Sequence, residues 1–284
     1  MTVSLAAVTA AASAAAAGRP AAPSAVLRHV QPALRSAVTN LTGTPVAVST
    51  VSASDAWAVE GTNLVLHWNG TSWVQTALPE YGTGSYLDAV DAVSATDVWT
   101  VGYYTTTAGK TQALAAHWNG TRWTLVTAPN PAKGGFLDLN GVSAASPSDI
   151  WAVGTYGNQK TLALHWNGTS WTQVATPSPG YAGNALSAVA AVSPSVAWAD
   201  GSYDVFRQTG AIPTKTLLLR WNGTHWTQVS TPNPGAAVST LNGVAASSAS
   251  DAWAVGFYQL PPSGGTTTSK TLMLRWNGAA WTRS

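Results

Sequence analysis

The chain has 284 residues, of which 45% are hydrophobic and only 8% charged, with a formal net charge of +2 and no cysteine. The absence of cysteine excludes a disulfide framework and a thiolate metal site. The low charge and the lack of a Lys/Arg run argue against nucleic-acid partners, because binding nucleic acid requires clustered cations to neutralise phosphates. The apolar fraction is enough for a substantial core in a chain of this length.

The first 25 residues predict a leader rather than part of the fold. Residues 3–17 form a run of small apolar side chains, which is shorter than the roughly 20 residues of a membrane-spanning helix. Such a run followed by A-x-A sites is typical of a signal peptide. We therefore expect a secreted, extracellular protein without a membrane span, the alternative being a disordered Ala-rich extension.

After residue 44 the tryptophans recur in five sets of three, with none left over. A residue this large does not recur in register by chance, so the sequence predicts a fivefold array of one structural unit. The sets are Trp57, Trp68 and Trp73; Trp99, Trp118 and Trp123; Trp151, Trp166 and Trp171; Trp198, Trp221 and Trp226; and Trp253, Trp276 and Trp281.

Length variation is confined to one connection of the unit. The second and third tryptophans are always 5 residues apart, whereas the first and second are separated by between 11 and 23 residues. In repeat proteins, insertions of this kind map to loops on one face, which is often the binding face. We therefore expect a single variable face.

The third unit, residues 139–180, reads as four short strands separated by turns. Its apolar and alternating runs are rich in Trp, Leu and β-branched residues, and Ser/Pro/Asp, Asn-Gly and Pro-rich segments bound them. The strands expected here are 139–145, 150–154, 161–166 and 169–176.

An Asn-Gly pair follows the second tryptophan of every unit. This pair is typical of a two-residue type I′ hairpin, which would place Trp166 opposite Thr169 and Leu164 opposite Trp171. Both tryptophans and the leucine would then share one face of the sheet. We expect the next copy of the same sheet to cover that face.

Five four-stranded antiparallel sheets that cover one another predict an all-β, five-bladed β-propeller. The segments SPSDIWAVG and TLALHWNGTSWTQV resemble the Trp-rich propeller repeats of secreted actinobacterial proteins, which are similar in layout to WD-repeat, Kelch and Asp-box blades. The resemblance implies that the first strand of each blade lines a central channel and that the variable connection joins the second and third strands. The expected blades are 45–80, 81–131, 132–180, 181–235 and 236–284.

Residues 26–44 are rich in Ala, Pro, Ser and Thr and contain no tryptophan. They predict a linker or pro-segment rather than a sixth blade. Because the ends of a ring must be joined, we expect part of this segment to pair near the last blade.

Residues that recur in several blades are expected to be structural. An Asp precedes the first tryptophan in four units, where it can accept hydrogen bonds from turn N–H groups. A His precedes the second tryptophan in three units, and its equivalent positions lie on separate blades, which favours packing over a shared metal. We expect no metal, no cofactor and no assigned catalytic residue. The residues are Asp55, Asp97, Asp149 and Asp251, and His67, His117 and His165.

The fourth blade departs from the repeat. It has Asp200 where the others have valine, and a buried acid costs several kcal/mol unless it is paired. With Tyr203 and Asp204 it predicts a ligand or ion site, and the alternative is a local salt bridge with Arg207 or Lys215.

Polar residues also stand at the start of the expected channel strands. Asp88, Asn140, Ser187 and Asn242 are equivalent positions that would form a polar ring at one mouth, or else cap turns and hold water. Asp91 is the only acid in the middle of such a strand. Because it is three residues from Asp88, the two should point to opposite faces and should not act as a catalytic pair.

Aromatic residues gather on the expected variable face, where they suit stacking on sugar rings or contact with a protein. The alternative is that they only cap the blades. On the variable connections they are Tyr103, Tyr104, Tyr156, Tyr203, Phe257 and Tyr258, and on the links between blades Tyr81, Tyr86 and Tyr181.

The function expected from these features is that of a monomeric, extracellular binding propeller that recognises a carbohydrate or another cell-surface polymer. One alternative is an enzyme, such as a lyase, glycosidase or cyclase, with Asp88, Asp91, Asp200 and Asp204 as its acids. The other is a passive scaffold for protein partners. Fold alone does not separate them, because propellers host many unrelated activities.

Overall fold

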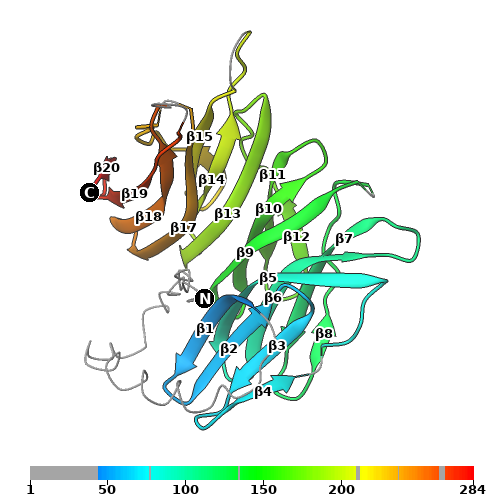
Figure 1. Cartoon of the computed structure of the whole chain (residues 1–284). Coiled ribbons are helices and arrows are strands. Elements are labelled where there is room, and N and C mark those ends of the chain that lie inside the picture. The colour runs from blue at the N-terminus through cyan, green and yellow to red at the C-terminus, as the bar shows by residue number, and fades with distance from the viewer. Residues whose placement is uncertain (1–43, 77, 134, 209–211, 236, 262–265) are drawn as a thin grey trace.

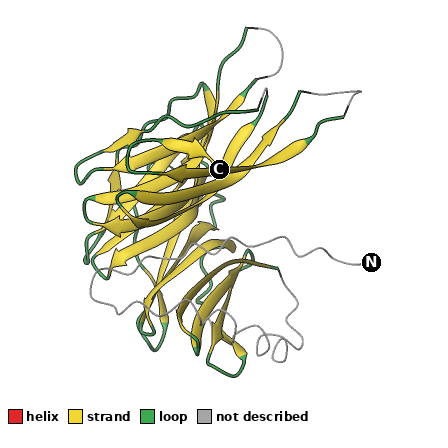
Figure 2. Cartoon of the chain, turned by 90° about the vertical axis from the view of Figure 1, so that its left-hand side faces the viewer, coloured by secondary structure: helices red, strands yellow, loops and turns green. Residues whose placement is uncertain are grey.

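The computed structural model describes residues 44–76, 78–133, 135–208, 212–235, 237–261 and 266–284. The described chain contains no helix and folds into five antiparallel sheets of four strands each (Figures 1 and 2). Within each sheet the strands lie side by side in chain order. The five-bladed all-β propeller expected from the sequence is therefore confirmed.

The strands of the five blades have the following bounds. The first blade contains β1 (Pro45–Ser52), β2 (Asp55–Glu60), β3 (Leu64–Trp68) and β4 (Trp73–Thr76). The second contains β5 (Gly84–Ser94), β6 (Asp97–Thr105), β7 (Thr111–Trp118) and β8 (Trp123–Leu125). The third contains β9 (Leu137–Ser146), β10 (Asp149–Tyr156), β11 (Lys160–Trp166) and β12 (Trp171–Val174). The fourth contains β13 (Ala182–Ser193), β14 (Val196–Asp204), β15 (Thr214–Trp221) and β16 (Trp226–Gln228). The fifth contains β17 (Ser239–Ser248), β18 (Asp251–Gln259), β19 (Ser269–Trp276) and β20 (Trp281–Arg283).

The first strands of successive blades contact one another, from β1 to β5, β9, β13 and β17. In each blade the end of the second strand pairs with the beginning of the first, as Thr105 pairs with Gly84. The connections between second and third strands therefore share one rim with the entries to the first strands. This rim, called the entry rim below, is the variable face expected from the sequence.

The tryptophan triplets form the interfaces between blades. The first tryptophan of one blade packs between the second and third of the next, as Trp151 does with Trp221 and Trp226, each at 4.9 Å between ring centroids. One of these contacts is edge-on, the arrangement that aromatic quadrupoles favour. The same packing joins the first blade to the second, the second to the third, and the fourth to the fifth.

The ring is open between the fifth and first blades (Figure 1). Apolar clusters join each of the four consecutive pairs of blades, and within the described ranges no such cluster joins the fifth blade to the first. Trp253 is 38% exposed, whereas the first tryptophans of the other four blades are fully buried. The expected leader, and the expected pairing of residues 26–44 near the last blade, lie outside the described residues.

The Asn-Gly hairpins differ from expectation. Trp166 pairs with Trp171, so the connection has four residues, and the predicted two-residue type I′ turn was wrong. Only the glycine has a positive φ, and Asn167 Oδ1 instead accepts hydrogen bonds from the backbone N–H groups of Thr169 and Ser170, both at 3.0 Å. The asparagine side chain thus closes a wider loop. The inference that both tryptophans and Leu164 share a face still holds, because directly paired residues lie on the same side.

The repeated histidines and aspartates form a structural unit within each of three blades. His165 Nε2 lies 2.8 Å from Asp149 Oδ1, and its ring lies 4.4 Å from that of Trp151. In the described chain, the carboxyl group of this aspartate therefore pairs with the histidine ring rather than with the turn backbone. In the fourth and fifth blades Arg220 and Arg275 take the place of the histidine above the first tryptophan. Both arrangements agree with a packing role.

Candidate functional site

A β-bulge in each first strand turns one side chain toward the centre of the propeller. In the second blade Leu87 pairs with Gly102 and Ala89 with Val101, which leaves Asp88 as the extra residue. Bulges re-aim side chains in this way. The extra residues at the equivalent sites are Val46, Asn140, Ser187 and Asn242.

The glycine of the W-A-V-G motif makes the bulge possible. A Cβ atom at Gly154 would overlap the carbonyl oxygen of Asp138, and Gly102, Gly201 and Gly256 approach the corresponding carbonyls in their own blades just as closely. In these four blades only a residue without a side chain fits opposite the bulge, whereas the first blade has Glu60 at this position. The motif therefore positions the side chains around the channel. Its recurrence in the sequence does not reveal this role.

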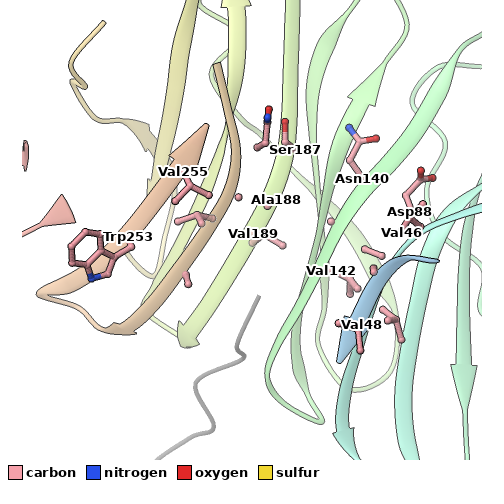
Figure 3. Close-up of a pocket in the computed structure, with 18 residues that line it drawn as sticks. Val46, Val48, Asp88, Asn140, Val142, Ser187, Ala188, Val189, Trp253 and Val255 are labelled. Atoms are coloured by element: carbon pink, nitrogen blue, oxygen red, sulfur yellow. The ribbon is translucent and has the colours of Figure 1, made fainter. Parts of the chain in front are cut away.

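These bulge residues line a central cavity of about 300 Å³. The polar ends of Asp88, Asn140 and Ser187 lie toward one end of the cavity, and valines of the first strands lie below them (Figure 3). The expected polar ring is thus present at the entry rim in four blades, with Val46 in the first. Because the ring of blades is open, Trp253 and Val255 of β18 also line the cavity.

An acid pair stands at the polar end of this cavity. Asp138, near the start of β9, is close enough to Asp88 of the preceding blade for the two carboxyls to shift each other's pKa. Asp88 Oδ2 and Asp138 Oδ1 are buried, and neither has a hydrogen-bond donor within the described chain. A proton held between the two carboxyls satisfies both oxygens.

The electrostatics of the pair favour that proton. Burial and the neighbouring charge of Asp88 raise the pKa of Asp138 to about 7, and burial also raises the pKa of Asp88. Two carboxylates this close cannot both ionise cheaply, so one proton is retained. A pair that shares one proton carries a single negative charge, and its remaining oxygens can accept hydrogen bonds.

Two stacked tyrosines adjoin the acid pair. Tyr86 and Tyr103 pair across β5 and β6, with ring centroids 5.3 Å apart and planes 9° from parallel. Tyr86 is 46% exposed. Burial, followed by the charges of Asp138, Tyr86 and Asp88, raises the pKa of Tyr103, which places its phenol in the same electrostatic environment as the acids. An exposed aromatic stack therefore lies next to an acid pair with raised pKa values.

Asp138 was not singled out in the sequence. It stands at the repeat position occupied by Tyr86 in the second blade and by Ala185 and Thr240 in the fourth and fifth. An acid that is unique at one repeat position was the available signal. Its partnership with Asp88 crosses a blade boundary, and no spacing rule in the sequence reports such a contact.

Asp91 lies in the wall between blades. Its Oδ1 accepts a hydrogen bond from Ser49 Oγ at 2.9 Å, and its Oδ2 accepts one from the backbone N–H of Ala144 at 2.8 Å. It therefore connects the first three blades. Asp88 and Asp91 are not brought together as a pair.

Asp200 is fully buried at the interface of the fourth and fifth blades. Burial raises its pKa well above the usual range, against the N–H groups of Ala188 and Gly243, which lower it. Neither Arg207 nor Lys215 forms a salt bridge with it among the described residues. Asp204 accepts a hydrogen bond from Thr214 Oγ1 at 2.7 Å. This contact joins the two ends of the loop between β14 and β15.

The remaining predicted aromatics are mostly part of the packing. Tyr104, Tyr156 and Tyr203 pack against the clusters between blades, Tyr258 is buried beside Arg283, and Phe257 is half-buried. The most exposed aromatics on the entry rim are instead Tyr86, Phe136, Tyr181 and Phe206. Phe136 and Phe206 were not among the sequence candidates.

The described segments contain no group of three or more His, Cys, Asp or Glu residues that could hold a metal ion. The same part of the chain has no helix that is long and apolar enough to cross a membrane.

Several solved propellers share this fold. Virginiamycin B lyase from Staphylococcus aureus matches with a TM-score of 0.52 and 15% identity over 84% of this chain and 79% of that one. A mutant Aleuria aurantia lectin in complex with Fucalpha1-6GlcNAc matches with a TM-score of 0.51 and 17% identity over 84% and 78%. YCF48 bound to D1 peptide matches with a TM-score of 0.47 and 12% identity over 86% and 82%. At these identities the similarity shows the fold alone. No protein-family model and no curated protein matches the chain.

Proposed function

We propose that this chain is a binding propeller that recognises carbohydrate at the polar end of its central cavity. The observation that carries the proposal is the exposed Tyr86 ring stacked on Tyr103, whose phenol is close enough to Asp88 and Asp138 for their charges to raise its pKa. The bulge residues Asn140 and Ser187 add further hydrogen-bonding groups to the same cavity.

This combination matches the chemistry of a sugar. The C–H face of a pyranose packs on an aromatic plane, and its hydroxyls both donate and accept hydrogen bonds. A carboxyl pair that keeps one proton carries only one negative charge, and its remaining oxygens can accept hydrogen bonds from sugar hydroxyls. A cavity of about 300 Å³ lies at the lower end of the usual range for ligand sites. A propeller of this fold, the Aleuria aurantia lectin, holds a disaccharide.

The proposal extends to an extracellular setting, where polymeric glycans are presented on cell surfaces. It is supported by the leader-like composition of residues 3–17 and by the low charge of the chain. Detection of the mature chain in culture medium, with a start near residue 25, would test this part separately.

The test of sugar binding is a glycan array followed by titration of each glycan that binds. Replacing Tyr86 with alanine should weaken binding about tenfold, because a stacking contact contributes about 1.4 kcal/mol. Tyr181→Ala is the matched control, since Tyr181 is an exposed tyrosine of the same rim that packs on Phe206 instead of on Tyr103. No binding across plant, fungal and bacterial glycans, or equal losses in both variants, would contradict the proposal.

A second candidate function is acid–base catalysis on a sugar. It is favoured by the shared proton of Asp88 and Asp138, since a carboxyl with a pKa near 7 can act as a general acid at neutral pH. Mass spectrometry of the bound glycans after incubation separates the two functions. Intact glycans support the binding propeller, and cleaved or eliminated products support the enzyme.

A further inference from the structure

A second hollow lies on the entry rim at the junction of the third and fourth blades. Its volume is about 220 Å³, and its lining includes Phe136, Asp138, Asn140, Thr155, Gln159 and Asn184. None of the recurring motifs in the sequence predicts it, because its wall combines the irregular entries to β9 and β13.

One wall of the hollow is aromatic and the other is polar. Phe136, which directly precedes β9, is 54% exposed. Opposite positions on β9 and β10 hold Asp138 and Thr155, and Thr155 is 7% exposed. The Thr155 hydroxyl has no hydrogen-bond partner in the described chain, and an unpaired buried hydroxyl costs free energy that a ligand group can recover.

The far side of the hollow is held rigid by hydrogen bonds across the blade boundary. Gln159 Oε1, in the connection between β10 and β11, accepts a hydrogen bond from Gly183 N–H at 2.7 Å. Asn184 is buried, and its Oδ1 accepts a hydrogen bond from Gly180 N–H at 2.6 Å. A wall that is already ordered does not have to be ordered again by the ligand, which favours binding.

The hollow adjoins the central cavity. Asn140 lines both spaces. Asp138 lines the hollow, and its partner Asp88 lines the cavity. The acid pair and Asn140 therefore stand between the central cavity and the hollow that contains Phe136, and Tyr103, on which Tyr86 stacks, also senses the charges of the pair.

From this arrangement we infer that the hollow is a second sugar subsite and that the ligand is an oligosaccharide of at least two units. This inference rests on the proposed function. One unit stacks on Tyr86 at the cavity mouth, and the next stacks on Phe136 with a hydroxyl to Thr155 Oγ1. Asp138 and Asn140 contact the ligand where the two units join.

The test is calorimetric titration with cello-, chito-, malto-, xylo- and manno-oligosaccharides of one to four units. In a series that binds, affinity should rise about tenfold from one unit to two. The variants Phe136→Ala and Thr155→Val should each lose most of that gain and leave the affinity for the single sugar unchanged. Because Phe136 is exposed, its replacement leaves the fold intact even if Thr155→Val does not.

Phe206→Ala is the control, because Phe206 is an exposed phenylalanine of the same rim outside both spaces. A single sugar that binds as tightly as its disaccharide, or a disaccharide unaffected by Phe136→Ala, would overturn the second subsite while leaving the proposed function in place. Failure of every series to bind would overturn both.

Discussion

At the scale of the residue, the proposed function depends on two carboxyls that lie close together across a blade boundary. Neither Asp88 nor Asp138 is unusual in its own strand. Their proximity makes one of them a proton donor at neutral pH, because the second negative charge has little solvent to stabilise it. The pKa of Asp200, in contrast, is raised by burial inside the protein. Its side chain is fully buried and therefore has no access to a ligand.

The acid pair predicts a pH dependence of stability. An aspartate titrates near 3.9 in the unfolded chain, and Asp138 titrates at about 7 in the folded one. The folded state therefore binds the extra proton between these values, so its contribution to stability is present below about pH 4 and is lost as pH rises through 7. Asp138→Asn should remove this loss. The thermal midpoint of the variant should therefore rise relative to that of the natural chain as the pH increases from 4 to 8.

Asp200 titrates in both proteins and so cancels in the comparison. A difference between the two thermal midpoints that stays constant from pH 4 to pH 8 would show that Asp138 is not the group responsible. Carbon NMR of the carboxyl groups measures the same pKa directly.

At the scale of the element, the bulge and its glycine position the channel side chains. Gly154→Ala should destabilise the protein by about 3 kcal/mol, because the new Cβ must displace the carbonyl of Asp138. The free energy of unfolding in urea measures the loss. Gly84→Ala serves as the comparison, since a Cβ there meets nothing within 4 Å, and its effect should stay within about 0.5 kcal/mol. Equal effects of the two substitutions would argue against the bulge as a close contact.

At the scale of the whole molecule, the open ring leaves four packed interfaces between blades and one gap. Trp198 fills the interface between the fourth and fifth blades, whereas Trp253, at the same repeat position, faces the gap. Trp198→Ala should therefore cost about 3–5 kcal/mol, and Trp253→Ala about 1 kcal/mol or less. Chemical denaturation measures both. A cost for Trp253→Ala that matched that of Trp198→Ala would show that its ring is covered in solution.

Much of the fold was predictable because the repeat averages out local ambiguity. Each strand of the third blade is short, but the same pattern occurs five times, and the tryptophans show how the five copies align with one another. The hairpin was mispredicted because Asn-Gly was taken as the whole turn, whereas the Asn167 side chain binds two further backbone N–H groups and widens it. Local propensity could not reveal that side-chain contact.

The candidate site was only half visible in the sequence. Asp88, Asn140, Ser187 and Asn242 were found because they are equivalent positions in a repeat. Asp138, Phe136 and Thr155 were missed because they are exceptions to the repeat, each acquiring its role from a neighbouring blade. Tyr104, Tyr156 and Tyr203 shared the expected rim. Because they pack against the blade interfaces, their side chains are only partly exposed.

The sequence by itself determined the number of blades, the strand order within each and the single rim that carries the length changes, because these follow from periodicity along the chain. Only the tertiary structure decided which side chains meet across blades and that, among the described residues, no other blade covers the fifth. Periodicity specifies what each blade is. The angles at which blades pack specify what lies between them, and those angles arise from contacts between residues far apart in the sequence.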